Sequence, residues 1–248
     1  MANPRVRPHL RFYPEDAGQT VNEYWQASHW HEDMDPTKST PMVTIQNQQY
    51  FVHEPCLLNN GLPCMPTRWF LRDQQVFAKA WTLRSISHES NSGWIVEAFN
   101  EIEVSADQFL VSFGNWPASK STEDLPRATQ IFGEDSPTGD SILNLLFSGT
   151  LAVCDGPLLP WAYTDAAVGN RWRALANGAR VYCFPIWLYC DDTSGNLSKK
   201  WNKHNSFLFT PAGLPRAHVH QEYNIHFLCT SNIAPPLEML DGIVDQLE

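Results

Sequence analysis

The sequence predicts an α+β protein, on three observations. Residues 43–111 contain short runs of aromatic and β-branched residues separated by turn formers, a pattern typical of antiparallel strands. Residues 181–190 form an uncharged, mostly apolar run that ends abruptly on Asp191 and Asp192. Residues 235–248 place apolar side chains at helical spacing. A β-rich N-terminal part is therefore expected to precede a smaller sheet and a helix.

The N-terminal part is expected to contain an irregular segment and a β-rich module. Residues 1–42 hold five prolines and show no sustained hydrophobic period, so no regular element is predicted there. Residues 43–116 are interpreted as a small, barrel-like β module, with a hairpin that turns at Asp73 and Gln74. Ser105, followed by Gln108 at the third helical position, matches a capping box and predicts a short closing helix.

Residues 117–170 are predicted to link the two parts. Residues 117–140 are rich in Pro, Ser, Thr, Glu and Asp and contain few strongly apolar residues, as expected at a domain boundary. Residues 141–147 favour a brief helix, and residues 155–172 favour a loop that wraps the core. The second domain is then expected over residues 171–248.

The C-terminal part is predicted to run strand, turn, strand, loop, strand, helix. The strands are expected at residues 181–190, 206–210 and 223–229, the first with both faces covered because its run is so apolar. Pro185 cannot donate a ladder hydrogen bond, so either a bulge lies there or the strand begins at Ile186. The helix is expected to pack on the sheet through one apolar stripe, consisting of Leu237, Leu240, Ile243, Val244 and Leu247.

The adjacent acids Asp191 and Asp192 are the candidate catalytic residues. Neighbouring carboxylates repel each other, so the pair is costly unless a cation or hydrogen-bond donors neutralise it. Mg²⁺ takes oxygen ligands and is often held by one or two carboxylates plus phosphates, as in two-metal phosphoryl transfer. The simpler alternative is an Asp-Asp turn in which a side chain accepts from local backbone donors.

The charge distribution singles out the same region. The net charge of −10 opposes non-specific DNA binding, and residues 12–170 alone carry seven Lys or Arg against twenty Asp or Glu. Residues 171–216 reverse this balance, with seven basic residues against two acidic ones. The candidate DNA-binding residues are Lys199, Lys200, Trp201 and Lys203, since basic and aromatic side chains together bind single strands. The alternatives are a solvated lysine turn and a Trp201 that anchors the core.

Histidines offer a different metal chemistry. His218, His220 and the nearby His226 could converge with Asp191 on a transition metal, as in a metal-dependent hydrolase. Solvent-exposed histidines are the simpler interpretation. The six cysteines show no CxxC spacing, which favours reduced thiols and no cysteine zinc site. No run is long and apolar enough for a membrane helix or a signal peptide, so an intracellular, non-secreted protein is expected.

Two longer runs resemble a known family. WLYCDDTSGNLSKKWNKHNSFLFTPAGLP and YNIHFLCTSNIAPPLEMLDGIVDQLE look like the start of the catalytic region in fungal transposases of the Plavaka group, relatives of the CACTA transposases. The resemblance implies a ribonuclease-H-like mixed sheet, here with three strands and its first helix. It implies Asp191 as the first catalytic carboxylate and metal ligand, with Asp192 as the alternative. It also implies Mg²⁺ or Mn²⁺ as cofactor, transposon-end DNA as partner and a nuclear location.

The family pattern is only partly present. A ribonuclease-H-like nuclease needs a second Asp after a later strand and an acid on a later helix, whereas this sequence stops inside the first helix. A truncated copy or a partial gene model is therefore expected, inactive as an isolated chain. Two alternatives stand beside the transposase hypothesis. One is a non-enzymatic interaction or DNA-binding protein derived from a transposon, and the other is the His/Asp hydrolase.

Overall fold

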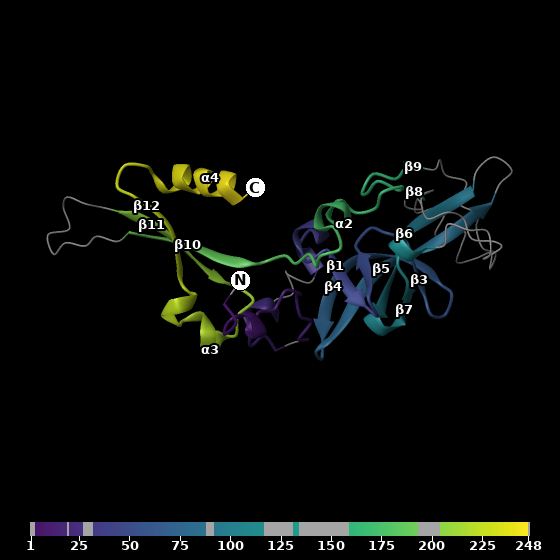
Figure 1. The fold of residues 1–248 in the computed structure, drawn as a ribbon, viewed down its shortest axis with the longest axis horizontal. Coiled ribbons are helices and arrows are strands. Elements are labelled where there is room, and N and C mark those ends of the chain that lie inside the picture. The colour runs from purple at the N-terminus through teal and green to yellow at the C-terminus, as the bar shows by residue number, and fades with distance from the viewer. Residues whose placement is uncertain are drawn as a thin grey trace, which may run out of the picture. The chain divides into compact units, whose positions relative to one another are not determined.

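The structure, a computed structural model, describes residues 3–18, 20–26, 32–87, 92–116, 131–133, 159–192 and 204–247. The chain divides into two compact units, each considered by itself (Figure 1). The large unit comprises Tyr13–Asp16 and His31–Cys183, and the small unit comprises Met1–Phe12, Ala17–Trp30 and Phe184–Glu248. Both contain strands and helices, so the expected mixture of α and β structure is confirmed.

A seven-stranded sheet forms the centre of the large unit. Its strands are β3 (Cys56–Leu58), β4 (Pro63–Arg72), β5 (Gln75–Ser87), β6 (Ser92–Ser105), β7 (Phe109–Val111), β8 (Ile131–Gly133) and β9 (Leu159–Pro160). Their order is β7-β3-β4-β5-β6-β8-β9, and every neighbouring pair is antiparallel except β6 and β8. Within the described residues this sheet is open, with β7 and β9 at its ends, whereas a small, barrel-like module was expected.

Two tight hairpins shape the large unit. The predicted turn at Asp73 and Gln74 joins β4 to β5, with Arg72 opposite Gln75. A second hairpin pairs β1 (Met42–Ile45) with β2 (Gln48–Phe51) in a separate two-stranded sheet. Both residues of each turn, including Gln46 and Asn47, have positive φ. Type I′ turns require such φ values, and their twist matches that of the flanking strands.

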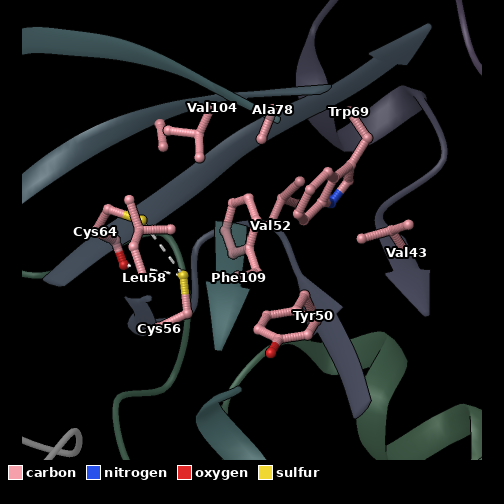
Figure 2. Packing of buried hydrophobic residues seen from close by; sticks show 11 residues of the cluster. Val43, Tyr50, Val52, Cys56, Leu58, Cys64, Trp69, Ala78, Val104 and Phe109 are labelled. Carbon is pink, nitrogen blue, oxygen red and sulfur yellow. Dashed lines mark hydrogen bonds between the residues drawn. The ribbon is translucent and has the colours of Figure 1, made fainter. Parts of the chain in front are cut away.

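The core of the large unit lies where β2, β4 and β7 bring aromatic rings together. The ring of Phe109 packs against the rings of Tyr50 and Trp69 (Figure 2). The ring centroids are 5.3 Å apart for Tyr50 and 5.2 Å apart for Trp69. The cluster of buried residues consists of Val43, Tyr50, Val52, Cys56, Leu58, Cys64, Trp69, Ala78, Ala80, Val104 and Phe109. Each such aromatic residue buries a large apolar area, so this cluster supplies much of the unit's stability.

The predicted linker over residues 117–170 needs correction, because its described parts belong to the large unit. Residues 117–130 and 134–158, including the predicted helix at 141–147, lie outside the described residues. However, Ile131 is buried in a second cluster with Met65 and Trp94, and Trp161 packs against the same cluster. The large unit therefore continues to Cys183, beyond the predicted boundary after residue 170. The reason is that strands β8 and β9 add to the sheet instead of leaving it.

Short helices complete the large unit. They are the 3₁₀ turns η4 (Pro36–Lys38), η5 (Ala106–Gln108) and η6 (Phe113–Asn115), and the helix α2 (Arg171–Ala176). The predicted capping box at Ser105 is wrong, because its side chain makes no capping hydrogen bond to η5. A capping box requires a full first turn of α-helix, and η5 is a 3₁₀ helix of only three residues. At α2 the Asn170 side chain instead caps the helix by accepting from Trp172 N–H.

The small unit contains a three-stranded antiparallel sheet with a helix on one face. Its elements are β10 (Ile186–Asp192), β11 (Asn205–Pro211), β12 (His226–Ser231), α3 (Arg216–Val219) and α4 (Pro236–Leu247), with 3₁₀ turns η1 (Arg7–His9), η2 (Tyr24–Gln26) and η7 (Glu222–Asn224). The strand order is β10-β11-β12. α4 packs on the sheet through Met239 and Ile243, which contact the buried Phe207.

Residues 1–42 do not form a segment of their own. Leu10 is buried with Leu214 and Val219 in the small unit, and Arg11 N–H donates to Gly213 C=O at 2.8 Å. Residues from His31 onward belong to the large unit instead. The prolines prevent long helices and strands here, but apolar side chains still anchor the segment by packing.

Two expectations for the small unit need correction, and one is confirmed. β10 begins at Ile186, directly after Pro185, which is one of the two predicted resolutions. However, β10 is not covered on both faces, because Trp187 is 47% exposed and lies on an edge strand. The predicted helical stripe is also rotated, since Leu237 is 76% exposed whereas Met239 is buried. In the described part of the chain, no helix has the length and apolarity that crossing a membrane requires.

Candidate functional site

The acidic pair lies at the end of β10. Asp191 is opposite Ser206 on β11, and Asp192 is opposite Asn205. Both aspartates are exposed. Because successive residues of a strand point to opposite faces of the sheet, the two carboxylates are directed away from each other. They are therefore not placed to hold one ion jointly from this strand.

Asp191 shares a face with exposed aromatic residues. Cross-strand pairing places Tyr189 opposite Leu208 and Leu208 opposite Phe227, and alternation along β10 adds Trp187 and Asp191 to the same face. We call this surface the aromatic face, consisting of Trp187, Tyr189, Asp191, Ser206, Leu208, Phe227 and Thr230. The Ser206 hydroxyl, which lies opposite Asp191, donates a hydrogen bond to the Thr230 hydroxyl on β12 at 3.1 Å.

Asp192 lies on the other face, which α4 covers. On this side Phe207 is opposite Cys190 and Cys229, and it packs against Met239 and Ile243 of the helix. The Asp192 carboxylate emerges at the edge of this packed face. The structure thus places the two candidate ligands on opposite faces of the sheet, Asp191 on the aromatic face and Asp192 on the face against which α4 packs.

An Mg²⁺ or Mn²⁺ ion fits Asp191 in part. A carboxylate oxygen is the ligand these ions prefer, and Mg²⁺ commonly keeps several waters and binds only one or two carboxylates. The position opposite Asp191 on the neighbouring strand β11 is Ser206, and Thr230 follows one strand further away on β12, so the described residues supply one carboxylate on this face. Further ligands would come from water and from substrate phosphates.

Of the remaining candidates, the structure describes only the histidines, and these have other ring partners or are exposed. Lys199, Lys200, Trp201 and Lys203 lie outside the described residues. His218 stacks on His9 with ring centroids 4.3 Å apart, and His226 stacks on Phe209 at 4.8 Å. His220 is exposed after α3. Over the described ranges, no group of three or more His, Cys, Asp or Glu side chains is arranged to share a metal ion.

The large unit contains a buried ion pair that sequence reasoning missed. Glu54 is 2% exposed and accepts two hydrogen bonds from Arg173, Nε to Oε1 at 2.9 Å and Nη2 to Oε2 at 2.6 Å. The Arg173 guanidinium also lies over the Phe51 ring, 4.7 Å from its centroid. Burial raises the pKa of the Glu54 carboxyl, whereas the Arg173 guanidinium opposes that shift.

The backbone around Gly169 completes this arrangement. Asn170 N–H donates to Glu54 Oε1 at 2.9 Å, and the Asn170 side-chain amide donates to Val52 C=O at 3.0 Å. Gly169 has φ +88°, and a Cβ there would lie 2.5 Å from Glu54 Oε1. Only glycine leaves room for the chain to approach the carboxylate so closely. The pair therefore fixes the loop that precedes α2 against the sheet.

A pocket of about 550 Å³ lies beside the fixed loop. Its lining includes Thr37, His53, Tyr163, Asn170, Arg171 and Trp172. The His53 ring packs on Trp81 at 5.8 Å and on Tyr163 at 5.0 Å, and burial lowers its pKa to about 4. His53 is therefore neutral near pH 7 and can both donate and accept a hydrogen bond. Arg171 lies over the Trp172 ring at 5.0 Å and adds a cation to the rim.

One sequence signal could have pointed to this region. Glu54 follows the apolar run that ends with Phe51 and Val52, and a carboxylate in such a position needs a partner when it is buried. The run Asn170 to Arg173 supplies the partner, but 119 residues separate Glu54 from Arg173. Nothing local in the sequence identifies which of the basic residues makes the pair.

Fold and site together define a mixed α and β protein in two units, with a pocket-bearing sheet unit and a small sheet that carries an exposed aspartate. A family model described as a domain of unknown function, DUF8591, matches residues 42–182, more than half of the chain. The chain belongs to this family. The matched range ends within one residue of the end of the large unit. Neither the curated proteins nor the solved structures include a significant match.

Proposed function

We propose that this chain derives from a DNA transposase, with the small unit as the opening part of a ribonuclease-H-like catalytic domain. The resemblance to Plavaka-group transposases motivates the proposal. The observation that supports it best is the sequence of elements, in which β10, β11 and β12 pair consecutively and α4 follows on one face. Asp191 lies near the end of the first of these strands, as the resemblance requires.

In this proposal Asp191 is one ligand of a catalytic Mg²⁺ or Mn²⁺ ion. The bound ion would activate an attacking oxygen and stabilise a leaving oxygen at a phosphodiester. Asp191 holds a negative charge at the aromatic face, and the hydroxyl of Ser206 lies on the paired position of β11. Since the described residues place one carboxylate on this face, the chain alone is expected to bind the ion weakly and to lack nuclease and strand-transfer activity.

Weak metal binding is testable with Mn²⁺ as a paramagnetic probe. In the 248-residue protein, millimolar Mn²⁺ should broaden the amide signals of Ser206 and Thr230 before those of the large unit. Asp191→Asn should abolish this selective broadening, because the ligand is lost. Asp192→Asn is the matched control and should retain it, since Asp192 lies on the opposite face. Equal loss in both variants, or broadening elsewhere only, would contradict the assignment of Asp191.

The expected absence of activity has its own test. Purified protein is incubated with plasmid and oligonucleotide DNA in the presence of Mg²⁺ or Mn²⁺. No cleavage above that of Asp191→Asn is expected. Metal-dependent cleavage that disappears in Asp191→Asn would show that the site is more complete than proposed, while still supporting the role of Asp191.

DNA contact is assigned to the basic residues that follow β10. Lys199, Lys200 and Lys203 would neutralise phosphates, and Trp201 would stack on a base. Replacing the three lysines with alanine should lower the slope of log affinity against log salt by about 2 to 3, measured with fluorescent DNA. Lys38→Ala, an exposed lysine of the large unit, should leave the slope unchanged. A transposase origin also implies a nuclear location, which a tagged protein would report.

A non-enzymatic interaction module is the second candidate, and the pocket of the large unit favours it. The lining combines the neutral imidazole of His53 with the exposed ring of Tyr163 and the cation of Arg171, which suits a small ligand or a peptide side chain. Ligand-observed NMR with a fragment library tests this possibility. Fragments that lose binding in Tyr163→Ala but keep it in Asp191→Ala would support the module. Binding that is insensitive to Tyr163→Ala would not.

A further inference from the structure

Strand β12 forms an edge of the small-unit sheet. The order of the sheet is β10-β11-β12, so β12 has β11 on one side and no other strand beside it among the described residues. An edge strand presents backbone N–H and C=O groups that are free to pair with another extended chain. Alternate residues of His226–Ser231 direct these groups to the free side, whereas the others pair with β11.

A groove runs between this edge strand and the helix α4. It has a volume of about 470 Å³ and a mainly apolar lining, with Leu228 and Cys229 contributed by β12 and Met239, Ile243 and Leu247 by α4. A chain that pairs with the edge of a sheet directs alternate side chains toward one face. Those side chains would enter this groove, because α4 covers that face of the sheet.

Gly242 leaves open space in the wall of the groove. It lines the groove from the middle of α4, and a Cβ built there meets no heavy atom within 4 Å. Glycine within a helix costs about 0.5–1 kcal/mol relative to alanine. No neighbouring atom in the described part of the chain would clash with a side chain at position 242, so the effect of the glycine is to widen the groove.

The rim of the groove is acidic. α4 carries Glu238, Asp241 and Asp245 and has no Lys, Arg or His. Residues three or four positions apart lie on the same side of a helix, so Glu238 and Asp245 flank Gly242 on either side along α4. A second copy of this helix would bring like charges together, whereas a basic segment would find complementary ones.

We propose that β12 and α4 form a docking site for an extended, basic peptide segment of a partner protein. The segment adds as a strand to the free edge of β12. Its alternate apolar side chains fill the groove, and its Lys or Arg residues lie against Glu238 and Asp245. This is recognition by strand addition, in which backbone hydrogen bonds supply affinity and side-chain contacts supply specificity. The proposal is independent of Asp191 and of the pocket in the large unit.

A model peptide tests the proposal directly. The probe is a fluorescent, acetylated nonapeptide in which lysine and valine alternate, and binding to the full chain is measured by anisotropy. Amide signals of β12 and α4 are expected to shift in NMR spectra. A peptide with the same side chains but with every backbone amide N-methylated is the control for strand addition, and it should bind at least about tenfold more weakly because it cannot donate ladder hydrogen bonds from either edge.

Three variants separate the groove from general charge attraction. Gly242→Leu should weaken binding at least about tenfold by filling the groove, and it should not disrupt the helix because leucine is a good helix former. Ala217→Leu on α3 adds the same bulk elsewhere and should bind normally. Glu238→Gln with Asp245→Asn should weaken binding about 3- to 10-fold, since two rim charges are lost. The single variant Glu222→Gln, an exposed acid outside the groove, should have little effect.

Defined results would overturn the proposal. They are equal binding of the N-methylated peptide, unchanged binding in Gly242→Leu, or shifted signals confined to the large unit. Sedimentation would reveal a different occupant, because self-association that Gly242→Leu abolishes would assign the groove to a second copy of this chain.

Discussion

Similar aromatic strands have opposite environments in the two units. In the large unit, Trp69 and Phe70 of β4 are 0% exposed, because β4 has neighbours on both sides and packed clusters around it. In the small unit, Trp187 and Tyr189 of β10 are 47% and 38% exposed. Aromatic and β-branched content predicted a strand in both places. The burial of a strand depends instead on what covers it, which is a property of the whole unit.

The acids of the two units differ in the same way. Glu54 is buried and held by Arg173, so its charge is already compensated within the fold. Asp191 is exposed on the aromatic face, and the residue opposite it on β11 is Ser206 rather than a basic residue. A compensated buried acid stabilises a structure, whereas an exposed acid among aromatic residues is available to a ligand. The two regions therefore suggest a structural role for one acid and a binding role for the other.

The largest expected effect is the loss of the Trp69 side chain. Trp69→Ala should lower the free energy of unfolding by about 3–5 kcal/mol, measured by chemical denaturation, because a fully buried indole leaves a cavity. Trp69→Phe is the matched control and should cost clearly less. Its ring retains much of the packing, and the Trp69 Nε1 has no hydrogen-bond partner in the described structure that would be lost. A cost below about 1 kcal/mol for Trp69→Ala would contradict the assigned core.

The next effect concerns the buried ion pair. Glu54→Gln should destabilise the large unit by about 2–4 kcal/mol, since the Arg173 guanidinium loses its charged partner in a largely buried site. The double variant Glu54→Gln with Arg173→Met should recover part of this loss, because no unpaired charge remains. Additive losses in this double-mutant cycle would indicate that the two side chains do not stabilise each other.

His53 should make the stability of the large unit depend on pH. Its pKa is lowered to about 4 by burial, below the ordinary value of 6.5, so the unfolded state binds the proton more readily. The stabilisation is complete above pH 6.5 and is lost as the pH falls through 4. When the pH falls from 6.5 to 4, the free energy of unfolding should fall by about 2–3 kcal/mol less in His53→Asn than in the unchanged protein. Asparagine tolerates the positive φ of this position and does not titrate. Parallel curves of unfolding free energy against pH for the two proteins would refute the lowered pKa of His53.

The smallest effect is expected on the aromatic face. Phe227 is 60% exposed, so Phe227→Ser should change the unfolding free energy by less than about 0.5 kcal/mol. Phe207→Ser, on the α4 side of the same sheet, should cost several times more because Phe207 is buried. A large effect of Phe227→Ser would show that another part of the chain covers this face, and the contrast between the two units would be weaker.

The sequence allowed several local features to be predicted. Asp73 and Gln74 formed the expected turn because their neighbours on both sides had strand character, and Pro185 correctly marked the start of β10. A strand leading to Asp191 and Asp192 was also predicted, and β10 forms there from Ile186 onward. In each instance the signal lies within a few residues, where backbone chemistry and hydrophobic period determine the structure.

The features that were missed depend on distant contacts. Glu54 and Arg173 are far apart in sequence, so their pairing has no local signal. The polar composition of residues 117–140 suggested a boundary, yet Ile131 pairs beside β6 and returns the chain to the sheet. On α4, Leu237 was predicted to face the core, but Met239 is buried in its place. Only packing against Phe207 selects Met239.

The strand order of the large unit has a consequence for how this protein folds. A tight turn joins β4 to β5, and β5 then pairs with β6. This three-stranded meander can form early because its contacts join residues that are near in sequence. β7 and β8 follow each other in the chain but flank the meander on opposite sides, and β8 pairs in parallel with β6. We therefore expect the outer strands to join late. During synthesis, the free edge of β6 would stay unpaired until β8 and β9, which end at residue 160, have been made.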